Sequence, residues 1–434
     1  MFLTLSLAAA PHALEAQASP LHVELDRFAA AVNSKVVAWR RDIHEHPELS
    51  GQEVRTAALV AKHLRALGLE VREGVGGTGV VGVLRGGRPG RVVALRADMD
   101  ALPVTEMVDL PFKSTVRARY NGQDVGVMHA CGHDNHVAML MGAAEVLTAM
   151  KARLPGTVVF LFQPAEEGGH PKGGGGAQWM LADGAFDDPK VEAVFGLHVG
   201  PGPLGIIGYR AGPTMAASNS FTLTVHGRQT HGARPWDGVD PIVIGSQIVM
   251  GLQTIISRQS DITSVPAIVT VGAFNGGIRS NIIPDSVVML GTVRTFDMSM
   301  REAIFMRLQR TAERIAASGG ARATVTIDSG YPVTRNDSSL TEQMLPTLRR
   351  VAGADNVVIA SLATGAEDFS YYQQRVPGLF VFLGVTPPEK DARTAPANHS
   401  PYFFADERAL PIGVRTLSAL AVDYLSPPAR RSAP

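Results

Sequence analysis

The sequence predicts an α/β protein in which a mostly parallel sheet is interrupted by an inserted ferredoxin-like unit. Apolar strands alternate with helices over roughly 25–212, and the order changes to β-α-β-β-α-β over roughly 217–327 before alternation resumes. The length of 434 residues also favours two domains over one core. The larger predicted domain is therefore discontinuous, comprising 19–216 and 328–434, and 217–327 forms the smaller one.

The first part of the chain supplies the strands and helices of the parallel sheet. Three apolar runs are expected to be its strands: 91–97, 157–163 and 191–199. A helix is expected over 135–150, with Asp134 as its N-cap. A second, over 176–184, is closed by Gly184. Strands that alternate with helices in this way favour a sheet covered on both faces.

The inserted unit has a different order of elements. Four strands are expected in it: 220–227, 267–274, 285–296 and 323–328. Its first helix, 240–258, has Asp240 as N-cap, and its second, 299–318, begins with a capping box of Ser299 and Glu302. An insertion of this kind leaves a cleft beside the larger domain, where a ligand is expected to bind.

The charge balance excludes some partners. Lys and Arg together number 40, as do Asp and Glu, so no excess of positive charge attracts nucleic acid or an anionic membrane. No apolar run approaches the roughly 20 residues that span a bilayer.

The N-terminus predicts export. Residues 1–18 combine an apolar stretch with a small-x-small ending at Ala18, although no Lys or Arg precedes that stretch. We therefore predict a signal peptide over 1–18 and a periplasmic or secreted protein, the alternative being a cytoplasmic one. The single cysteine, Cys131, excludes an internal disulfide.

Six potential metal-binding side chains lie beside predicted strands or helix starts. They are Cys131, His133, Glu166, Glu167, His198 and His399. Each alone has an ordinary explanation, since a buried cysteine packs as a small hydrophobe and a core histidine often only hydrogen-bonds. Together, however, they should converge at the carboxyl edge of the sheet. Thiolate, imidazole and carboxylate ligands suit zinc, or else manganese, cobalt or nickel.

This set is too large for one tetrahedral zinc ion. We therefore predict two divalent ions, about 3.5–4 Å apart, that share a bridging ligand and a water. Of the adjacent glutamates, Glu166 and Glu167, one would bind metal and the other would accept a proton. A structural zinc remains an alternative, but such sites are closed by four ligands, so the surplus counts against it.

The chain resembles the M20 metallopeptidases, and within them the amidohydrolase branch that includes hippurate hydrolases, N-acyl-amino-acid amidohydrolases and auxin-conjugate hydrolases. The resemblance covers about residues 35–425. It is carried by linked motifs in the right order: "RRDIHEHPELSGQE", "LRADMDALPVTE", "MHACGHDNHVAML", "FLFQPAEEGG", "GLHV", "HGARPWDGVDPI", "NIIPD", "GTVRTF", "GAEDFS" and "NHSPYF".

The resemblance implies roles for these residues. Five side chains would bind the two ions, the first of them as the bridge: Cys131, His133, Glu167, His198 and His399. Glu166 would be the general base and then the acid, taking a proton from water and passing it to the leaving amine. Asp98 would orient the site. Arg96 stands where peptidase branches carry a metal-binding histidine, which fits the amidohydrolase branch.

The inserted unit would then be a lid and dimerisation domain. His231 would reach the partner's active site and stabilise the oxyanion. Asn281 and Arg294 would contact substrate, Arg294 through a carboxylate, although the residues alone also fit a turn and a charged strand face. There are two departures from the branch: Trp236 would alter the cleft rim or the lid packing, and the extra loop residues 169–173 at the mouth of the site would narrow substrate choice.

The sequence thus predicts a dinuclear metal-dependent amidohydrolase that cleaves N-acyl amino acids and forms a homodimer through its lid. A dipeptidase or carboxypeptidase of the same fold, acting on short peptides, remains open. A non-catalytic metal-binding or peptide-binding protein is disfavoured, because Glu166 and the five ligands are all intact.

Overall fold

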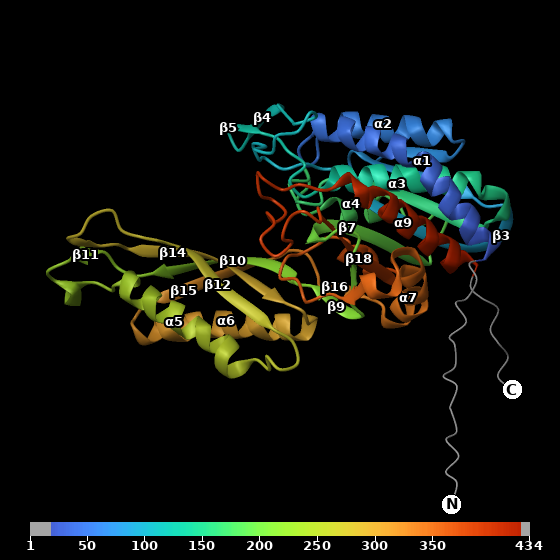
Figure 1. Ribbon diagram of the computed structural model, residues 1–434. Helices are drawn as coiled ribbons and strands as arrows, with labels where there is room; N and C mark the ends of the chain where they lie inside the picture. Colours follow the sequence, from blue (N-terminus) through green and yellow to red (C-terminus); the bar gives the residue numbers. More distant parts are fainter. Residues whose placement is uncertain (1–18, 427–434) are drawn as a thin grey trace, which may run out of the picture.

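Two sheets of different construction organise the computed structural model, which describes residues 19–426 (Figure 1). The predicted signal peptide, 1–18, lies outside the described residues. The larger sheet has eight strands. In spatial order they are β1 (Glu70–Val75), β2 (Gly79–Arg85), β6 (Pro155–Gln163), β3 (Arg88–Asp98), β7 (Ala193–Pro203), β18 (Gly378–Thr386), β8 (Ile207–Tyr209) and β17 (Val357–Ile359).

The centre of the large sheet is parallel. β6, β3, β7 and β18 run in one direction, and β1, β2 and β8 join by antiparallel pairing. In β3, Leu95 pairs with Phe160 on one side and Phe195 on the other. All three side chains are buried, as expected where helices cover both faces of a sheet.

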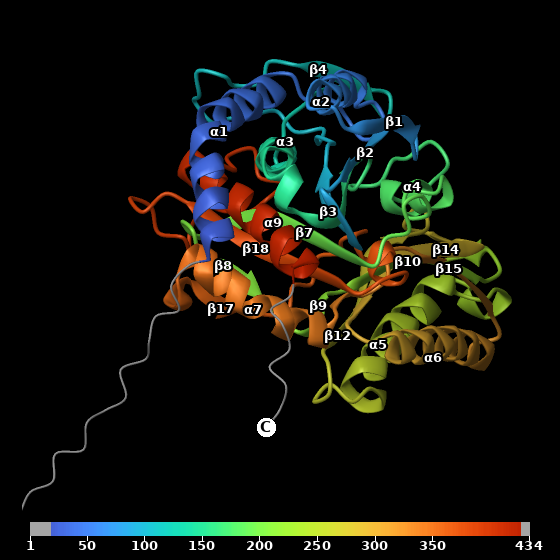
Figure 2. The same ribbon diagram turned by 90° about the vertical axis from the view of Figure 1, so that its right-hand side faces the viewer.

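Helices cover the two faces unequally (Figure 2). The larger group is α1 (Pro20–Glu45), α2 (Val54–Ala66), α3 (His133–Ala149), α7 (Ser338–Ala352) and α9 (Leu410–Leu425). The smaller group is α4 (Gly176–Ala182) and α8 (Ser370–Gln373). Along β3, Val93 and Leu95 pack with the larger group, whereas Ala94 packs with the smaller one. This alternation places two cores on the two faces and confirms the predicted α/β class.

The inserted unit is β10 (Ala217–His226), α5 (Pro241–Gln259), β12 (Ala267–Asn275), β14 (Ser286–Thr295), α6 (Met298–Ser318) and β15 (Arg322–Ser329). Its sheet has the order β12-β14-β10-β15, and all neighbouring strands are antiparallel. Leu223 and Met289 of this sheet pack against Ile248 of α5 and Leu308 of α6. The element order and the packing are those of the predicted ferredoxin-like unit.

Two predicted helix caps are wrong. α3 begins at His133 after Gly132, and the carboxylate of Asp134 instead accepts hydrogen bonds from Arg40 Nε at 2.8 Å and His44 Nδ1 at 2.9 Å. α6 is capped by Asp297, which accepts from the backbone of the residue three positions on at 2.7 Å, rather than by a Ser299 capping box. The predicted Asp240 cap of α5 is confirmed.

The remaining elements are short. They are β4 (Arg117–Tyr120), β5 (Gln123–Gly126), β9 (Gly212–Met215), β11 (Thr230–His231), β13 (Ile282–Ile283), β16 (Thr334–Asn336), η1 (Lys151–Arg153), η2 (Pro235–Asp237), η3 (Ala354–Asn356) and η4 (Glu407–Ala409). β9 and β16 pair where the chain enters and leaves the inserted unit. Within residues 19–426, none of the helices combines the length and apolarity needed to cross a membrane.

Candidate metal centre and active site

The five predicted metal ligands converge near the carboxyl ends of the central strands. Two of the groups that their donor atoms form share Cys131, and within each of these two groups all atoms lie within 4.8 Å of one another. One group is Cys131, His133 and His198, and the other is Cys131, Glu167 and His399. Both contain the single thiol. Two three-ligand groups that share one sulfur are the arrangement expected for two ions with a bridging Cys131.

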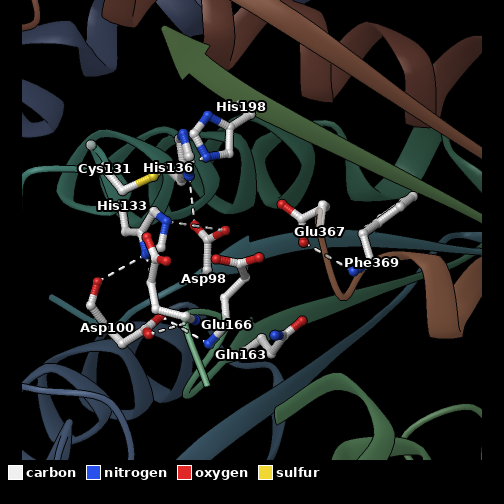
Figure 3. Close-up of polar contacts among 12 residues, drawn as sticks. Asp98, Asp100, Cys131, His133, His136, Gln163, Glu166, His198, Glu367 and Phe369 are labelled. Atoms are coloured by element: carbon white, nitrogen blue, oxygen red, sulfur yellow. Dashed lines mark hydrogen bonds and ion pairs between the residues drawn. The ribbon is translucent and has the colours of Figure 1, made fainter. Parts of the chain in front are cut away.

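In His133 and His198, Nδ1 is bonded to a backbone carbonyl, which leaves Nε2 as the nitrogen toward the other predicted ligands, and Figure 3 shows the bond from His133 to Asp100. His133 Nδ1 donates to the backbone carbonyl of Asp100 at 2.8 Å, and His198 Nδ1 donates to that of Val199 at 2.7 Å. Because a carbonyl only accepts, the proton is assigned to Nδ1 and the lone pair to Nε2. His198 Nε2 then lies 3.4 Å from the sulfur of Cys131. This tautomer is the one that metal-binding histidines adopt.

The donor set fits divalent metal ions. His133 Nε2 is buried and has no hydrogen-bond partner among the described residues, and Glu167 Oε1 lies 2.9 Å from His399 Nε2. Burial, with Glu167 and Glu166 nearby, raises the pKa of the Cys131 thiol well above its usual range. A bound cation reverses that effect, because a metal-coordinating thiol loses its proton. A thiolate with imidazoles and carboxylates suits zinc and other borderline ions.

Local backbone geometry places these ligands. Gly132, between two ligands, has φ +91°, and a Cβ there would lie 2.5 Å from Val199 Cγ2, so only glycine fits. Asn398 Nδ2 donates to the carbonyls of Cys131 at 2.9 Å and Val199 at 3.1 Å. His399 follows with φ +71°, a conformation rare outside glycine. Three loops are thereby tied together around the donor atoms.

A buried arginine neutralises the carboxylates beneath the site. Arg96 Nη1 lies 2.6 Å from Asp98 Oδ2, and Arg96 Nη2 lies 2.9 Å from Glu367 Oε1 and 3.0 Å from Asp368 Oδ1. Arg96 Nε donates to Gln163 Oε1 at 2.8 Å. All five side chains are buried. Sequence reasoning gave Glu367 and Asp368 no role, and the structure makes them partners of Arg96.

Asp98 lies in a buried polar network, and His136 is the member that sequence reasoning missed. His136 Nδ1 donates to Asp98 Oδ1, while His136 Nε2 accepts the Val199 N–H at 2.8 Å. Both ring nitrogens are therefore used, so His136 positions Asp98 rather than binding metal. Burial opposes ionisation of Asp98, but Arg96 and the neighbouring histidines hold its pKa well below the usual range.

Asp100, which was also missed, is the carboxylate directly behind the predicted metal ligand His133. Its Oδ1 lies 3.2 Å from His133 Nδ1, whereas Asp98 Oδ2 is 3.7 Å from His133 Nε2. The N–H groups of Glu166 and Glu167 donate to Asp100 at 3.1 Å and 3.0 Å. The available signal was the repeated carboxylate of "RADMD", which places Asp100 just past the end of β3.

Glu166 is a buried carboxylate whose donor atom lies within 4.8 Å of those of His133 and Glu167, and Figure 3 shows it next to Asp98. Burial, followed by the charges of Glu367 and Glu167, raises the pKa of Glu166 well above its usual range. A carboxyl group of raised pKa holds a transferred proton more firmly, as a general base that later acts as an acid requires.

A cavity of about 770 Å³ joins these residues to the inserted unit. Five of the lining residues are Cys131, Glu166, Glu167, His198 and His399. Arg294 of β14 also lines it, and its half-buried guanidinium has no ion-pair partner among residues 19–426. Burial lowers the pKa of Arg294. The apolar wall includes Ile206, Met215, Phe382 and Leu383.

His231 and Asn281 do not line the cavity of their own chain. Both are exposed: His231 lies on β11, and Asn281 directly precedes β13, the strand that pairs with β11. Gly232 N–H donates to the Asn281 carbonyl at 2.8 Å. Figure 1 shows β11 at the end of the inserted unit that is remote from the large sheet. Trp236, also exposed, follows β11.

The extra loop 169–173 does not line the cavity either. His170 stacks on Trp179 of α4, with ring centroids 5.4 Å apart, and Trp179 Nε1 donates to the Gly173 carbonyl at 2.7 Å. The predicted effect of this loop on substrate choice therefore has no direct contact to support it.

The fold and this site define a dinuclear metal hydrolase. Residues 94–423 match the family described as peptidase family M20/M25/M40, and the chain belongs to that family.

Similar proteins are named for two kinds of function. Thermostable carboxypeptidase 2 of Saccharolobus solfataricus is 42% identical over 392 residues, covering 90% of this chain and 95% of that one. N-acetyl-L-cysteine deacetylase of Bacillus subtilis is 38% identical over 382 residues, covering 88% and 86%. The crystal structure of a Bacillus subtilis protein described as a dinuclear metal binding peptidase from the M20 family aligns with TM-score 0.76 and 36% identity, covering 92% of this chain and 99% of that one.

Proposed function

We propose that the protein hydrolyses the amide bond of N-acyl amino acids, releasing a carboxylic acid and a free amino acid. Arg294 carries this proposal, because its guanidinium has no ion-pair partner among the described residues and lines the same cavity as Glu166 and the ligand groups. A guanidinium can bind a carboxylate through two parallel hydrogen bonds. The apolar wall at Ile206, Met215 and Phe382 would receive the acyl group.

The chain's own residues would carry the proton transfers. Two divalent ions would be held by the groups that share Cys131, and we propose that both are zinc. When bound, such ions activate water and polarise a carbonyl. Glu166 would accept a proton as the water oxygen bonds to the carbonyl carbon. It would return that proton to the amine nitrogen as the C–N bond breaks. Arg294 would hold the carboxylate throughout.

A second candidate is peptide hydrolysis on the same site. It is favoured by the relative named thermostable carboxypeptidase 2, and Arg294 would equally bind the C-terminal carboxylate of a peptide. The two candidates differ only in the group on the acyl side of the scissile bond.

The deciding experiment measures amino-acid release from hippurate, N-acetyl amino acids, an indole-acetyl conjugate and several dipeptides. Zinc, manganese or cobalt is added in turn, with a chelator as control. We expect metal-dependent release that is faster from the N-acyl substrates. Faster dipeptide cleavage would move the protein to the second candidate, and chelator-resistant release would contradict both.

We further propose a homodimer formed through the inserted unit. Its edge strand β12 has a free side, since β12 is the last strand of the small sheet. Large apolar side chains are exposed on this unit: Trp236, Ile242, Val243, Met250, Ile262, Ile268, Phe274, Ile278, Leu290 and Met306. Burying such a surface against a second copy would be favourable.

Dimerisation would place His231 of one chain at the cavity of the other, where it would stabilise the oxyanion. His231→Ala and Glu166→Gln should each be nearly inactive as homodimers. Mixed dimers should recover activity, because one of their two sites then keeps both residues. Purified mixed dimers, separated by two affinity tags, provide the measurement. No recovery in such dimers would mean that His231 does not act across the interface.

A further inference from the structure

The backbone that carries Glu166 is held in a rare conformation. Ala165, directly before it, has φ +50°, in the left-handed region that side chains with a Cβ disfavour. Such conformations persist where surrounding contacts enforce them, and they gather at functional sites. The contacts that enforce this one therefore decide where the Glu166 carboxylate points.

Glu53, at the start of α2, supplies one of these contacts. Its side chain is fully buried, and Oε1 accepts the Ala165 N–H at 2.9 Å and the Gly51 N–H at 2.7 Å. Oε2 accepts the Thr78 hydroxyl. No basic side chain lies within ion-pair distance of Glu53 among the described residues. A buried carboxylate without a cation is costly, so its three hydrogen bonds are what stabilises it here.

Tyr331 supplies another contact, from a different part of the fold. Its hydroxyl donates to the backbone carbonyl of Glu166 at 2.7 Å. Tyr331 lies between β15 and β16, where the chain returns from the inserted unit, and its own carbonyl accepts the Ser218 N–H at 3.0 Å. Through Tyr331, the Glu166 peptide is therefore linked by hydrogen bonds to the segments that enter and leave the inserted unit.

We propose that Glu53 and Tyr331 are positioning residues that fix the Glu166 carboxylate by binding the backbone on either side of it. Asp100 also binds this segment, but it touches His133 as well, so its removal would disturb metal binding. Glu53 and Tyr331 belong to neither of the ligand groups that share Cys131. Because Glu166 is the base only under the proposed function, this inference rests on that function.

Tyr331→Phe is the sharper test, because it removes one hydroxyl and keeps the ring. We expect kcat to fall roughly 10-fold to 100-fold, as displaced catalytic groups do, with KM and metal content unchanged. Tyr371→Phe is the matched control, since that ring packs edge-on to Tyr331 with centroids 6.1 Å apart, and its kcat should stay normal. A raised KM with normal kcat would make Tyr331 a substrate contact and overturn the inference.

Glu53 is tested by a pair of variants. Glu53→Ala removes the acceptor for the Ala165 N–H and should lower kcat, whereas Glu53→Gln keeps an Oε1 acceptor and should restore most of it. Glu48→Ala is the control, because Glu48 lies in the same loop and accepts the N–H groups of Arg55 and Thr56, both at 2.8 Å, without reaching Glu166. It should lower the melting temperature but leave kcat normal.

A purely structural role for Glu53 would make Glu53→Ala behave like Glu48→Ala, and that result would contradict the inference. If Glu53→Ala does not fold, Glu53→Gln and Tyr331→Phe still decide. Glu166→Gln separates the two levels of the argument. Normal turnover in Glu166→Gln would show that Glu166 is not the base and would contradict the proposed function. An inactive Glu166→Gln beside a fully active Tyr331→Phe would leave that function standing and contradict only the positioning roles.

Discussion

Glu166→Gln is expected to lower kcat by about 10²–10⁴-fold while two metal ions remain bound. Glutamine has the size of glutamate, but its amide does not accept and return a proton at neutral pH. Glu166 is in neither of the two groups that share Cys131, so the ligands for both ions are left intact. Turnover on an N-acyl amino acid, measured beside metal content per chain, gives both quantities.

Glu167→Gln provides the comparison that separates the adjacent glutamates. Glu167 belongs to the group with Cys131 and His399, and His399 Nε2 lies 2.9 Å from its Oε1. Its variant should lose metal first and regain part of its activity when the metal concentration is raised. Excess metal should not rescue Glu166→Gln. If the two variants exchanged these behaviours, the roles of base and ligand would have to be exchanged as well.

Much of the fold was predictable because its signals are local. The apolar run at 157–163 lies within β6, the run at 191–199 overlaps most of β7, and the change of order near residue 217 marks the start of β10. The capping residues of helices were harder to predict, since several residues near the start of α6 can accept a backbone N–H. Asp297 does so in place of Ser299. The hairpin strands β1 and β2 were not predicted, and only the pairing of β2 with β6, which is distant in the sequence, joins this hairpin to the sheet.

The structure brings together the predicted metal ligands, which are residue types that follow strands, but their supporting residues could not be predicted. His133 and His136 are three positions apart on α3 and look alike in the sequence. Only the distant Val199 N–H and the Asp98 carboxylate, which occupy both His136 nitrogens, distinguish the ligand from its neighbour. Glu53 likewise lies 112 residues from Ala165, so no local pattern reveals their contact.

Arg96→Met is expected to destabilise the protein by about 3–5 kcal/mol, the usual cost of removing one partner of a buried ion pair. Methionine fills part of the space but leaves Asp98, Glu367 and Asp368 buried without the cation that all three contact. Like charges held together in a dry interior repel one another strongly. The midpoint of urea unfolding, compared with that of the unmodified protein, measures the loss.

Arg85→Met is the matched control for this prediction. Arg85 Nε lies 2.8 Å from Glu70 Oε1, a distance similar to those around Arg96, but both side chains are exposed. Surface pairs of this kind contribute little to stability, so the urea midpoint should hardly move. Equal small losses in the two variants would mean that the carboxylates near Glu166 take up protons when Arg96 is gone. The buried arginine would then set the charge of the site rather than its stability, and activity rather than unfolding would show the larger change.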